Sequence, residues 1–369
     1  MTQSKRIVLT IINDINYDQR MIRICTSLAK AGYEVLLVGR EHSKSQVLIP
    51  RDFQQHRIKV GQESGKLMYF LFWIRLFFFL YKQKADVFCA IDLDSILPVY
   101  AASKLKGIKR VYDAHELFTE MQEVVTRKRE KRMWDWIERF SVPRFPVGYT
   151  IGDCYAEVFY QKYGVNYEVV RNATILRPLP EVAKPEPYIL YQGAVNVGRC
   201  FEYLIPAMAQ VPVPLIICGA GNFFEQAQQL VRLHGLEEKV IFKGYVPPDQ
   251  LLEYTRKASI GITLFEALGP SNRLSMANRF FDYMHNAIPQ LCMDYPEYRK
   301  VNEQFEIAHL IQEPDINQIA TALRQMLNNK EYLQRLSDNC LAAREVYCWQ
   351  EEEKKLLKVY QQLFQEREK

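Results

Sequence analysis

The sequence lacks the features that identify several common classes of protein. Its net charge is only +5 over 369 residues. No zinc-ligand spacing, RNP motif or basic heptad segment accompanies that charge, which argues against a nucleic-acid partner. The eight cysteines stand singly, with no CxxC pair. This distribution is typical of reduced core thiols and not of a disulfide framework.

Long apolar runs are also missing. The most apolar stretch, residues 67–81, is interrupted by Arg75 and falls short of the about 20 residues that a membrane-spanning helix needs. Residues 6–12 form an apolar run that is too short for a secretory signal, and polar residues follow it. We therefore expect a cytoplasmic protein.

What the sequence contains is a regular alternation of strand-like and helix-like segments. An apolar strand at 6–12, a helix at 21–31 and a second strand at 31–40 predict a β-α-β unit. The loop between the first strand and the helix has no glycine-rich phosphate motif, so it gives no support for a dinucleotide site. Its Asp18 and Arg20 are candidates for contact with a polar ligand, with a solvated loop as the alternative.

A proline-rich segment divides this alternation into two halves. Residues 176–187 contain four prolines, which indicates a linker between domains. Strands and helices alternate again after it, and the pattern from residue 316 onward is helical. We therefore predict two α/β domains, residues 1–175 and 188–349, each large enough for its own core.

Polar residues follow two strands of the first half, at the points where those strands end. Asp92 and Asp94 follow one strand, and His115, flanked by Asp113 and Glu116, follows the next. Ligands of parallel sheets collect at the carboxyl ends of strands. A histidine between carboxylates can make a polar contact or transfer a proton. His115 is therefore the candidate catalytic residue, although structural histidines are more common.

Glycines occupy the strand-to-helix junctions of the second half. They are Gly193, Gly198, Gly219 and Gly221. A backbone without side chains can approach a phosphate closely there, although a turn alone also needs glycine. Arg199 stands at an expected helix start, where a diphosphate needs a cation beside the helix N–H groups.

Residues 274–289 predict a short helix with an unusual carboxylate. Ser275 or Asn278 is the expected cap, and a proline closes the segment. Asp282 lies within a run of aromatic residues. A phosphate at the helix start and a hydroxylated ring at Asp282 would satisfy both groups. The alternative is a core helix with an ordinary surface aspartate.

Two aromatic segments leave open a contact with a membrane. Residues 67–81 favour a buried crossover helix, but their aromatic residues exceed what one buried stripe needs, so an interfacial helix is the alternative. Residues 127–140 place lysines and arginines beside Trp134 and Trp136, which supports that alternative. A solvated amphipathic helix would give the same pattern.

Taken in order, these segments resemble a known family, the retaining GT-B glycosyltransferases of family 4 (glycosyl transferases group 1). The most specific are YDAHELF at 112–118 and MANRFFDYM at 276–284, which resemble the family patterns YDSHELF and SPNKLFEYM. Weaker matches extend over nearly the whole chain: IDLD at 91–94, YQGAVNVGR at 191–199, CGAGN at 218–222, FKGYVPPDQL at 242–251 and WQEEEKKLLKVY at 349–360.

The resemblance implies a fold and a separate binding role for each domain. The fold is α/β of the GT-B type: two facing Rossmann-like, doubly wound domains with an interdomain cleft. The first domain binds the acceptor, the second binds the sugar nucleotide, and a final helix at about residues 350–369 packs back on the first.

The resemblance also assigns roles to individual residues. His115 lies beside the reacting sugar, Asp282 holds the ribose, Arg199 holds the diphosphate, and the segment from Gly244 to Val246 lies against the base. The implied donor-binding residues are Gly193, Arg199, Gly219, Gly244, Val246, Met276, Ala277, Asn278 and Asp282. The implied acceptor-binding residues are Asp18, Arg20, Asp92 and Asp94.

Three departures from the family pattern concern the sugar more than the fold. Leu274 stands eight residues before Asp282, where the family often has a glutamate that contacts the sugar. Asp282 itself replaces a glutamate. Ala194 replaces a frequent arginine, which leaves Arg199 as the clearest cation and Arg279 as a candidate substitute.

The expected function follows from the resemblance. A sugar moves from a nucleoside-diphosphate donor, a UDP- or GDP-sugar, to a glycan or lipid-linked acceptor, with retention of anomeric configuration and without a metal or cofactor. The expected pathway is the synthesis of cell-surface polysaccharide or glycoconjugates, with peripheral contact at the inner face of the membrane. Two alternatives stay open: a sugar-nucleotide epimerase of the same fold, and a non-catalytic partner subunit.

Overall fold

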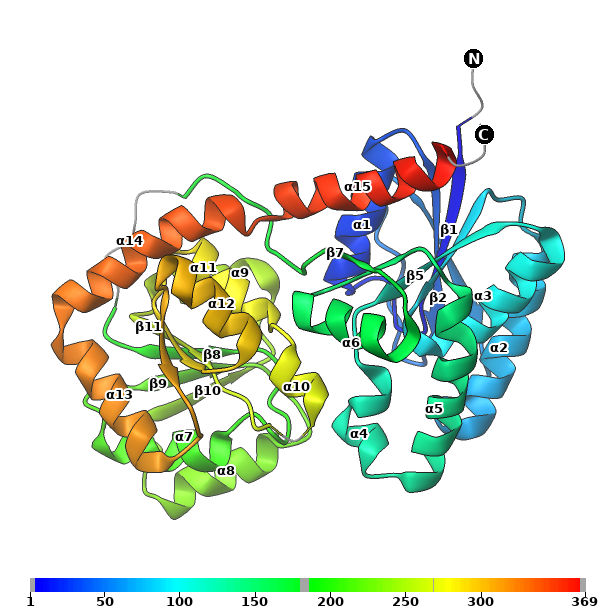
Figure 1. The fold of residues 1–369 in the computed structure, drawn as a ribbon. Helices are drawn as coiled ribbons and strands as arrows, with labels where there is room; N and C mark the ends of the chain where they lie inside the picture. The colour runs from blue at the N-terminus through cyan, green and yellow to red at the C-terminus, as the bar shows by residue number, and fades with distance from the viewer. Residues whose placement is uncertain (1–3, 180–185, 268, 366–369) are drawn as a thin grey trace. The chain divides into compact units, whose positions relative to one another are not determined.

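The chain forms two compact units, each with its own parallel sheet (Figure 1). A computed structural model describes residues 4–179, 186–267 and 269–365. One unit comprises Met1–Asn172 with Glu352–Lys369, and the other comprises Ala173–Glu351. Both are Rossmann-like, which confirms the predicted fold class. Of the predicted linker, residues 180–185 lie outside the described residues.

The described part of the first unit holds a seven-stranded parallel sheet in the order β3-β2-β1-β4-β5-β6-β7. Its strands are β1 Arg6–Thr10, β2 Glu34–Glu41, β3 Gln54–Lys59, β4 Val87–Ile91, β5 Lys109–Ala114, β6 Gly148–Thr150 and β7 Glu168–Val169. Its helices are α1 Gln19–Lys30, α2 Gly65–Lys82, α3 Asp92–Lys106, α4 Gln122–Val125, α5 Lys128–Ser141 and α6 Asp153–Tyr163, with the 3₁₀ turns η1 Phe118–Glu120 and η2 Val142–Arg144.

The strand order of this sheet reverses between β1 and β4. The chain moves outward from β1 to β3 on one side and from β4 to β7 on the other. In open parallel sheets, ligands bind at the carboxyl ends of the strands beside such a reversal. Asp92 and Asp94, which directly follow β4, therefore lie at the position where a ligand is expected.

The central strands are apolar along most of their length. All five residues of β4 are buried, as are the last four residues of β1. Helices cover both faces of the sheet, with α1 on one face and α2 and α3 on the other (Figure 1). A strand covered on both faces reads as a continuous apolar run, because neither of its faces meets water.

Helix α2 is apolar on its buried face and on its exposed face. One set of residues, spaced by four, is buried: Met68, Phe72, Leu76 and Leu80. A second set is exposed: Leu67, Phe70, Ile74, Phe78 and Tyr81. The predicted burial is therefore confirmed for only one side of the helix.

Within the described residues, no helix combines the length and the apolar character that crossing a membrane requires.

The second unit, as far as it is described, holds a six-stranded parallel sheet in the order β10-β9-β8-β11-β12-β13. Its strands are β8 Ile189–Gln192, β9 Leu215–Cys218, β10 Val240–Gly244, β11 Ile260–Thr263, β12 Gln290–Met293 and β13 Ala308–Ile311. Its helices are α7 Phe201–Ala207, α8 Phe224–Leu233, α9 Pro248–Lys257, α10 Pro270–Leu274, α11 Asn278–His285, α12 Pro296–Phe305, α13 Ile316–Asn328 and α14 Lys330–Val346, with the 3₁₀ turn η3 Met208–Gln210. The order reverses between β8 and β11, so their carboxyl ends mark the expected ligand position of this sheet.

Helix α15, Trp349–Gln365, starts in the second unit and continues in the first. In the first unit it buries Leu356 and Tyr360 completely. The hydroxyl of Tyr360 lies 3.5 Å from the hydroxyl of Tyr149 on β6. The core of the first unit therefore includes residues from both ends of the sequence.

A buried ion pair links α1 to β5. Arg20 donates from Nε and Nη2 to the two carboxylate oxygens of Asp113 over 3.1 and 2.8 Å, and from Nη1 to the carbonyl of Val170 over 3.0 Å. The side chain of Arg20 is 3% exposed and that of Asp113 is 0% exposed. Removing one partner from such a pair leaves a buried charge without compensation.

We expect the substitution Arg20→Met to destabilise the protein by about 3–5 kcal/mol, because Asp113 would keep its charge without a partner. Urea unfolding measures the change. Lys30→Met, on an exposed position of the same helix, serves as the control and should stay within about 0.5 kcal/mol of the wild type. Adding Asp113→Asn to Arg20→Met should recover part of the loss. A cost of Arg20→Met no larger than that of the control would contradict the role of the ion pair.

Candidate active site

Asp92 organises the loop that carries His115. Its backbone is in the left-handed region, with φ 51°, a conformation that residues with a side chain rarely adopt. From there its Oδ1 accepts the backbone N–H groups of His115 and Glu116, each over 3.1 Å. The strained residue therefore fixes the loop after β5 through hydrogen bonds to a carboxylate.

The same carboxylate faces the imidazole of His115. Nδ1 of His115 lies 3.1 Å from Oδ2 of Asp92, and the histidine side chain is 20% exposed. Burial raises the pKa of Asp92 to about 8, against a lowering effect of His115. Burial alone would lower the pKa of His115, but the charges of Asp92 and Asp113 outweigh it and raise the pKa. The pair can hold a proton near neutral pH, as a general acid or base must.

Asp94 contacts aromatic residues of α2. Its backbone carbonyl accepts the indole N–H of Trp73 over 2.6 Å. Burial raises the pKa of the Asp94 carboxyl to about 7, although a hydrogen bond with Tyr69 acts to lower it. Tyr69 and Trp73 both pack against Trp134 of α5. Asp94 therefore joins the site to the layer formed by α2 and α5, and its predicted contact with an acceptor stays a prediction.

Two residues that were predicted to contact the acceptor have structural roles in the first unit. Arg20 is committed to Asp113 and Val170 inside the first unit, so it is not available to an acceptor. Asp18 caps α1, with Oδ1 accepting the N–H of Met21 over 2.9 Å. A polar residue in a loop after a strand suits a ligand and a helix cap equally well, which is why the sequence did not separate the two roles.

In the second unit, the loops after β8 and β9 pack backbone against backbone. Gly219 has φ 156°, and a Cβ at this residue would lie 1.8 Å from the carbonyl oxygen of Gly193. The N–H of Gly219 also donates to the carbonyl of Gly244 over 2.7 Å. Close packing of three strand ends therefore requires glycine at 219, whether or not a phosphate approaches it.

Two arginines lie near these loops, beside the reversal of the sheet. The guanidinium carbons of Arg199 and Arg279 are each 4.5 Å from the ring centre of Phe265, which follows β11. Arg279 is 7% exposed and donates to the carbonyl of Gln192 over 3.0 Å. A Cβ on Gly193 would be 3.3 Å from its Nη1. Arg279 thus lies beside the first glycine of this unit, and its role as a substitute cation stays a prediction.

The start of α11 differs from the prediction. Neither Ser275 nor Asn278 caps it: the N-cap is Ala277, without a side-chain cap, and Ser275 ends α10. The N–H of Ala277 donates to the hydroxyl of Tyr298 over 2.9 Å, so it is not available for the predicted contact with a diphosphate. Met276 is buried in the core of the unit, whereas Asn278 is exposed at the first helical position.

Asp282 belongs to a chain of hydrogen bonds. Its Oδ1 accepts the hydroxyl of Thr174 over 2.7 Å and its Oδ2 accepts the amide of Gln192 over 3.2 Å. Gln192 in turn accepts the hydroxyl of Thr255 over 2.7 Å. The carboxylate is therefore oriented at the carboxyl end of β8.

Thr174, Gln192 and Tyr69 were not predicted from the sequence. Gln192 is a polar residue at the end of an apolar strand, the same signal that identified Asp92, and could have been found. Thr174 and Tyr69 reach their aspartates from distant segments and carry no local signal. For the base site, Val246 is half-buried and packs against the cluster around Leu190. No group of three metal-ligating side chains occurs in the residues that the structure describes.

We expect Asp92→Asn to change how stability depends on pH. A carboxyl whose pKa is higher in the folded chain binds its proton more tightly when folded. Its contribution to the free energy of unfolding is fully present below about pH 4 and is lost as the pH rises through about 8. The wild type should therefore lose stability, on the order of a few kcal/mol, that Asp92→Asn does not lose over this range.

Urea unfolding at several pH values measures this difference. The asparagine keeps an oxygen that can accept the two backbone N–H groups, so the fold is preserved. Asp249→Asn, at an exposed position of α9, is the control and should follow the wild type. Parallel curves for the wild type and Asp92→Asn would show that the carboxyl does not titrate as stated.

Family models match both halves of the chain. Residues 174–341 match a model described as glycosyl transferases group 1, and residues 13–136 match one described as glycosyl transferase 4-like. The first range lies in the second unit and the second range in the first unit. Among curated proteins, none matches the chain.

Solved structures share the fold at low sequence identity. Sucrose-phosphate synthase from Thermosynechococcus elongatus has a TM-score of 0.79 and 16% identity, covering 98% of this chain and 99% of that one. Anabaena HepE with UDP-glucose has a TM-score of 0.76 and 13% identity, covering 97% and 99%. WaaG, a glycosyltransferase involved in lipopolysaccharide biosynthesis, has a TM-score of 0.73 and 13% identity, covering 95% and 98%. Because each unit is a Rossmann-like domain that matches a glycosyltransferase model, we conclude that the chain is a glycosyltransferase of the GT-B type.

Proposed function

We propose that the protein transfers a sugar from a nucleoside-diphosphate donor, a UDP- or GDP-sugar, to a glycan or lipid-linked acceptor, with retention of anomeric configuration. The observation that carries the donor class is the pair Arg199 and Arg279, both 4.5 Å from Phe265 at the reversal of the second sheet. A diphosphate needs cations at such a position. HepE, which is similar in fold, was solved with UDP-glucose.

The chemistry of the transfer suits these cations. Departure of a nucleoside diphosphate from the anomeric carbon leaves negative charge on phosphate, which fixed positive charges stabilise. Aromatic faces hold Arg279 in place, because its guanidinium carbon lies 4.4 Å from the ring centre of Tyr191 as well as beside Phe265. In this proposal the arginines supply the charge compensation, so the reaction needs no metal or cofactor.

His115 is the first unit's proposed contribution to the transfer step. Asp92 acts as a positioning residue, because it binds the backbone of the loop and faces Nδ1 of the imidazole. Nε2 of His115 has no hydrogen-bond partner in residues 4–179, 186–267 or 269–365. We propose that this nitrogen contacts the reacting sugar, and that the acceptor binds to the same unit.

The two candidate residues should fail in different ways. We expect His115→Ala to lower kcat by about 10²- to 10⁴-fold while leaving the affinity for nucleotide nearly unchanged. Asp282→Ala should weaken nucleotide binding by about 10- to 100-fold, because a charged hydrogen bond to the ribose is lost. Calorimetry with UDP and GDP measures the affinity, and a panel of sugar nucleotides with glycan acceptors measures the turnover.

Thr174→Val supplies the matched control for Asp282. It removes the hydroxyl that donates to Oδ1 of Asp282 and leaves the carboxylate, so nucleotide binding should persist. Equal losses in Thr174→Val and Asp282→Ala would assign the effect to local structure and not to a ribose contact. Failure of the wild type to bind either nucleotide would overturn the donor class. Conversion of the donor without an acceptor would indicate an epimerase.

We also propose that the exposed face of α2 rests on an anionic membrane surface, which would place a lipid-linked acceptor within reach. Phe70 and Phe78 are each 57% exposed on this face, and the exposed Lys66 and Lys82 stand near its two ends. Glu130, near the start of the basic helix α5, is 3.3 Å from Lys66. Aromatic side chains flanked by lysines suit the interface of an anionic bilayer. WaaG, similar in fold, is involved in lipopolysaccharide biosynthesis.

Sedimentation with vesicles tests the membrane contact. The wild type should bind vesicles that contain phosphatidylglycerol, and Phe70→Ser with Phe78→Ser should reduce binding by about tenfold or more, because two partly inserted rings are removed. Leu233→Ser is the control, since Leu233 is 77% exposed at the end of α8 in the other unit. Equal binding by the wild type and the double variant would contradict the membrane contact.

A further inference from the structure

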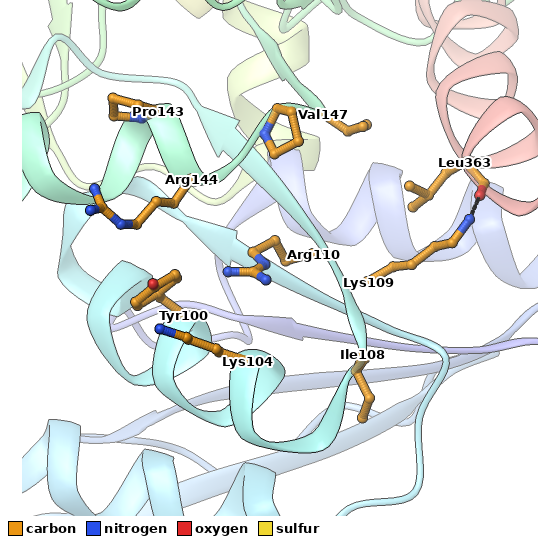
Figure 2. Close-up of a pocket in the computed structure, with 10 residues that line it drawn as sticks. Tyr100, Lys104, Ile108, Lys109, Arg110, Pro143, Arg144, Val147 and Leu363 are labelled. Atoms are coloured by element: carbon orange, nitrogen blue, oxygen red, sulfur yellow. Dashed lines mark hydrogen bonds between the residues drawn. The ribbon is translucent and has the colours of Figure 1, made fainter. Parts of the chain in front are cut away.

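A cavity of about 520 Å³ lies in the first unit, away from His115. Its walls come from α3, the start of β5, the turn η2 and α15 (Figure 2). Strand β5 runs from Lys109, at the cavity, to Ala114, just before His115. At about 3.3 Å per residue, the amino end of the strand is roughly 20 Å from the histidine. The cavity is therefore at the opposite edge of the sheet from the candidate active site.

The lining of this cavity is positively charged. Lys104 of α3, Lys109 and Arg110 of β5, and Arg144 of η2 all line it, and no acidic residue does. In the described ranges, none of these four side chains forms an ion pair with a carboxylate. This differs from Arg20, whose charge is compensated by Asp113. Four cations with no carboxylate partner among the described residues produce a positive potential that favours an anion.

Three of the cations surround one aromatic ring. Arg110 Cζ is 5.0 Å, Lys104 Nζ is 5.8 Å and Arg144 Cζ is 6.0 Å from the ring centre of Tyr100. Figure 2 shows their charged groups gathered around this tyrosine. Burial would raise the pKa of Tyr100, but hydrogen bonds and charges of Lys104 and Arg144 outweigh it and lower the pKa. The lowered pKa of Tyr100 agrees with a positive potential at this ring.

Three of these cations contact the backbone or an aromatic ring. Arg144 donates to the carbonyl of Phe140, and its guanidinium carbon lies 4.1 Å from the Phe140 ring centre. Lys109 donates to the carbonyl of Leu363 on α15. Burial lowers the pKa of Arg110, whose Cζ is 5.9 Å from the ring centre of Phe145. Cations that are held in place lose little freedom when an anion binds.

We propose that this cavity is a second anion site, which binds a phosphate monoester or diphosphate group at the amino edge of the first sheet. Two guanidinium forks and two ammonium groups match the several oxygens and the multiple charge of such a group. The proposal does not depend on the donor site of the second unit. The phosphoryl group could belong to a free ligand or to a lipid headgroup, since both present the same chemistry to the cations.

Binding of inorganic pyrophosphate to the full chain tests the proposal. Calorimetry at low salt should show that Arg110→Gln with Arg144→Gln weakens pyrophosphate binding by at least about tenfold, because charge-assisted hydrogen bonds are lost. Lys30→Gln with Arg139→Gln, at exposed positions of the same unit, removes the same formal charge elsewhere. This control should bind pyrophosphate like the wild type.

Three further measurements separate the explanations. Arg199→Gln should not affect the pyrophosphate binding that depends on Arg110 and Arg144. The double variant Arg110→Gln with Arg144→Gln, the pocket variant, should bind UDP as well as the wild type does. Vesicles of phosphatidylcholine, with and without phosphatidic acid, test the lipid source. If the pocket variant, but not its control, loses binding to vesicles with phosphatidic acid while its pyrophosphate binding is unchanged, the result would support the site with a lipid headgroup as its ligand. The pocket variant and the control should have the same urea unfolding midpoint, so that a folding defect is excluded. If they then bind pyrophosphate equally well and phosphatidic acid equally well, the proposal is overturned.

Discussion

The first unit depends on one buried interaction, the ion pair of Arg20 with Asp113. Asp113 lies two residues before His115, and the guanidinium also binds the carbonyl of Val170 and lies 5.8 Å from the ring centre of Tyr149. One side chain thus joins α1, β5, β6 and the segment after β7. The negative charge of Asp113 also helps to raise the pKa of the histidine, while the charge of Arg20 acts to lower it. Stability and site electrostatics therefore share a single contact.

Two buried arginines of the chain have different kinds of partner. Arg20 has a carboxylate partner, so its charge is internal to the fold. Arg279 is also buried, but aromatic rings and a backbone carbonyl hold it, and these neighbours are neutral. In the proposed function, a ligand compensates its positive charge. The partner of an arginine, and not its burial, decides whether it stabilises the fold or creates a binding site.

Patterns that depend on neighbouring residues were predicted from the sequence. Buried strands such as β4 follow from continuous apolar runs, and the rule for the carboxyl ends of strands located Asp92 and His115. Features that depend on distant residues were not predicted. The partner of Arg20 is 93 positions away, and Tyr298 takes the N–H of Ala277 from a separate helix. The left-handed backbone of Asp92 has no local signal either, because the hydrogen bonds that hold it come from the next strand end.

The path of α15 has a consequence for the order of folding. The first unit buries Leu356 and Tyr360 of this helix, yet the whole second unit separates these residues from α6 in the sequence. Contacts between such distant segments form late, because a long loop must close first. During synthesis, the second unit can complete its sheet while the first still lacks part of its core. The unit that leaves the ribosome first is therefore the one that finishes folding last.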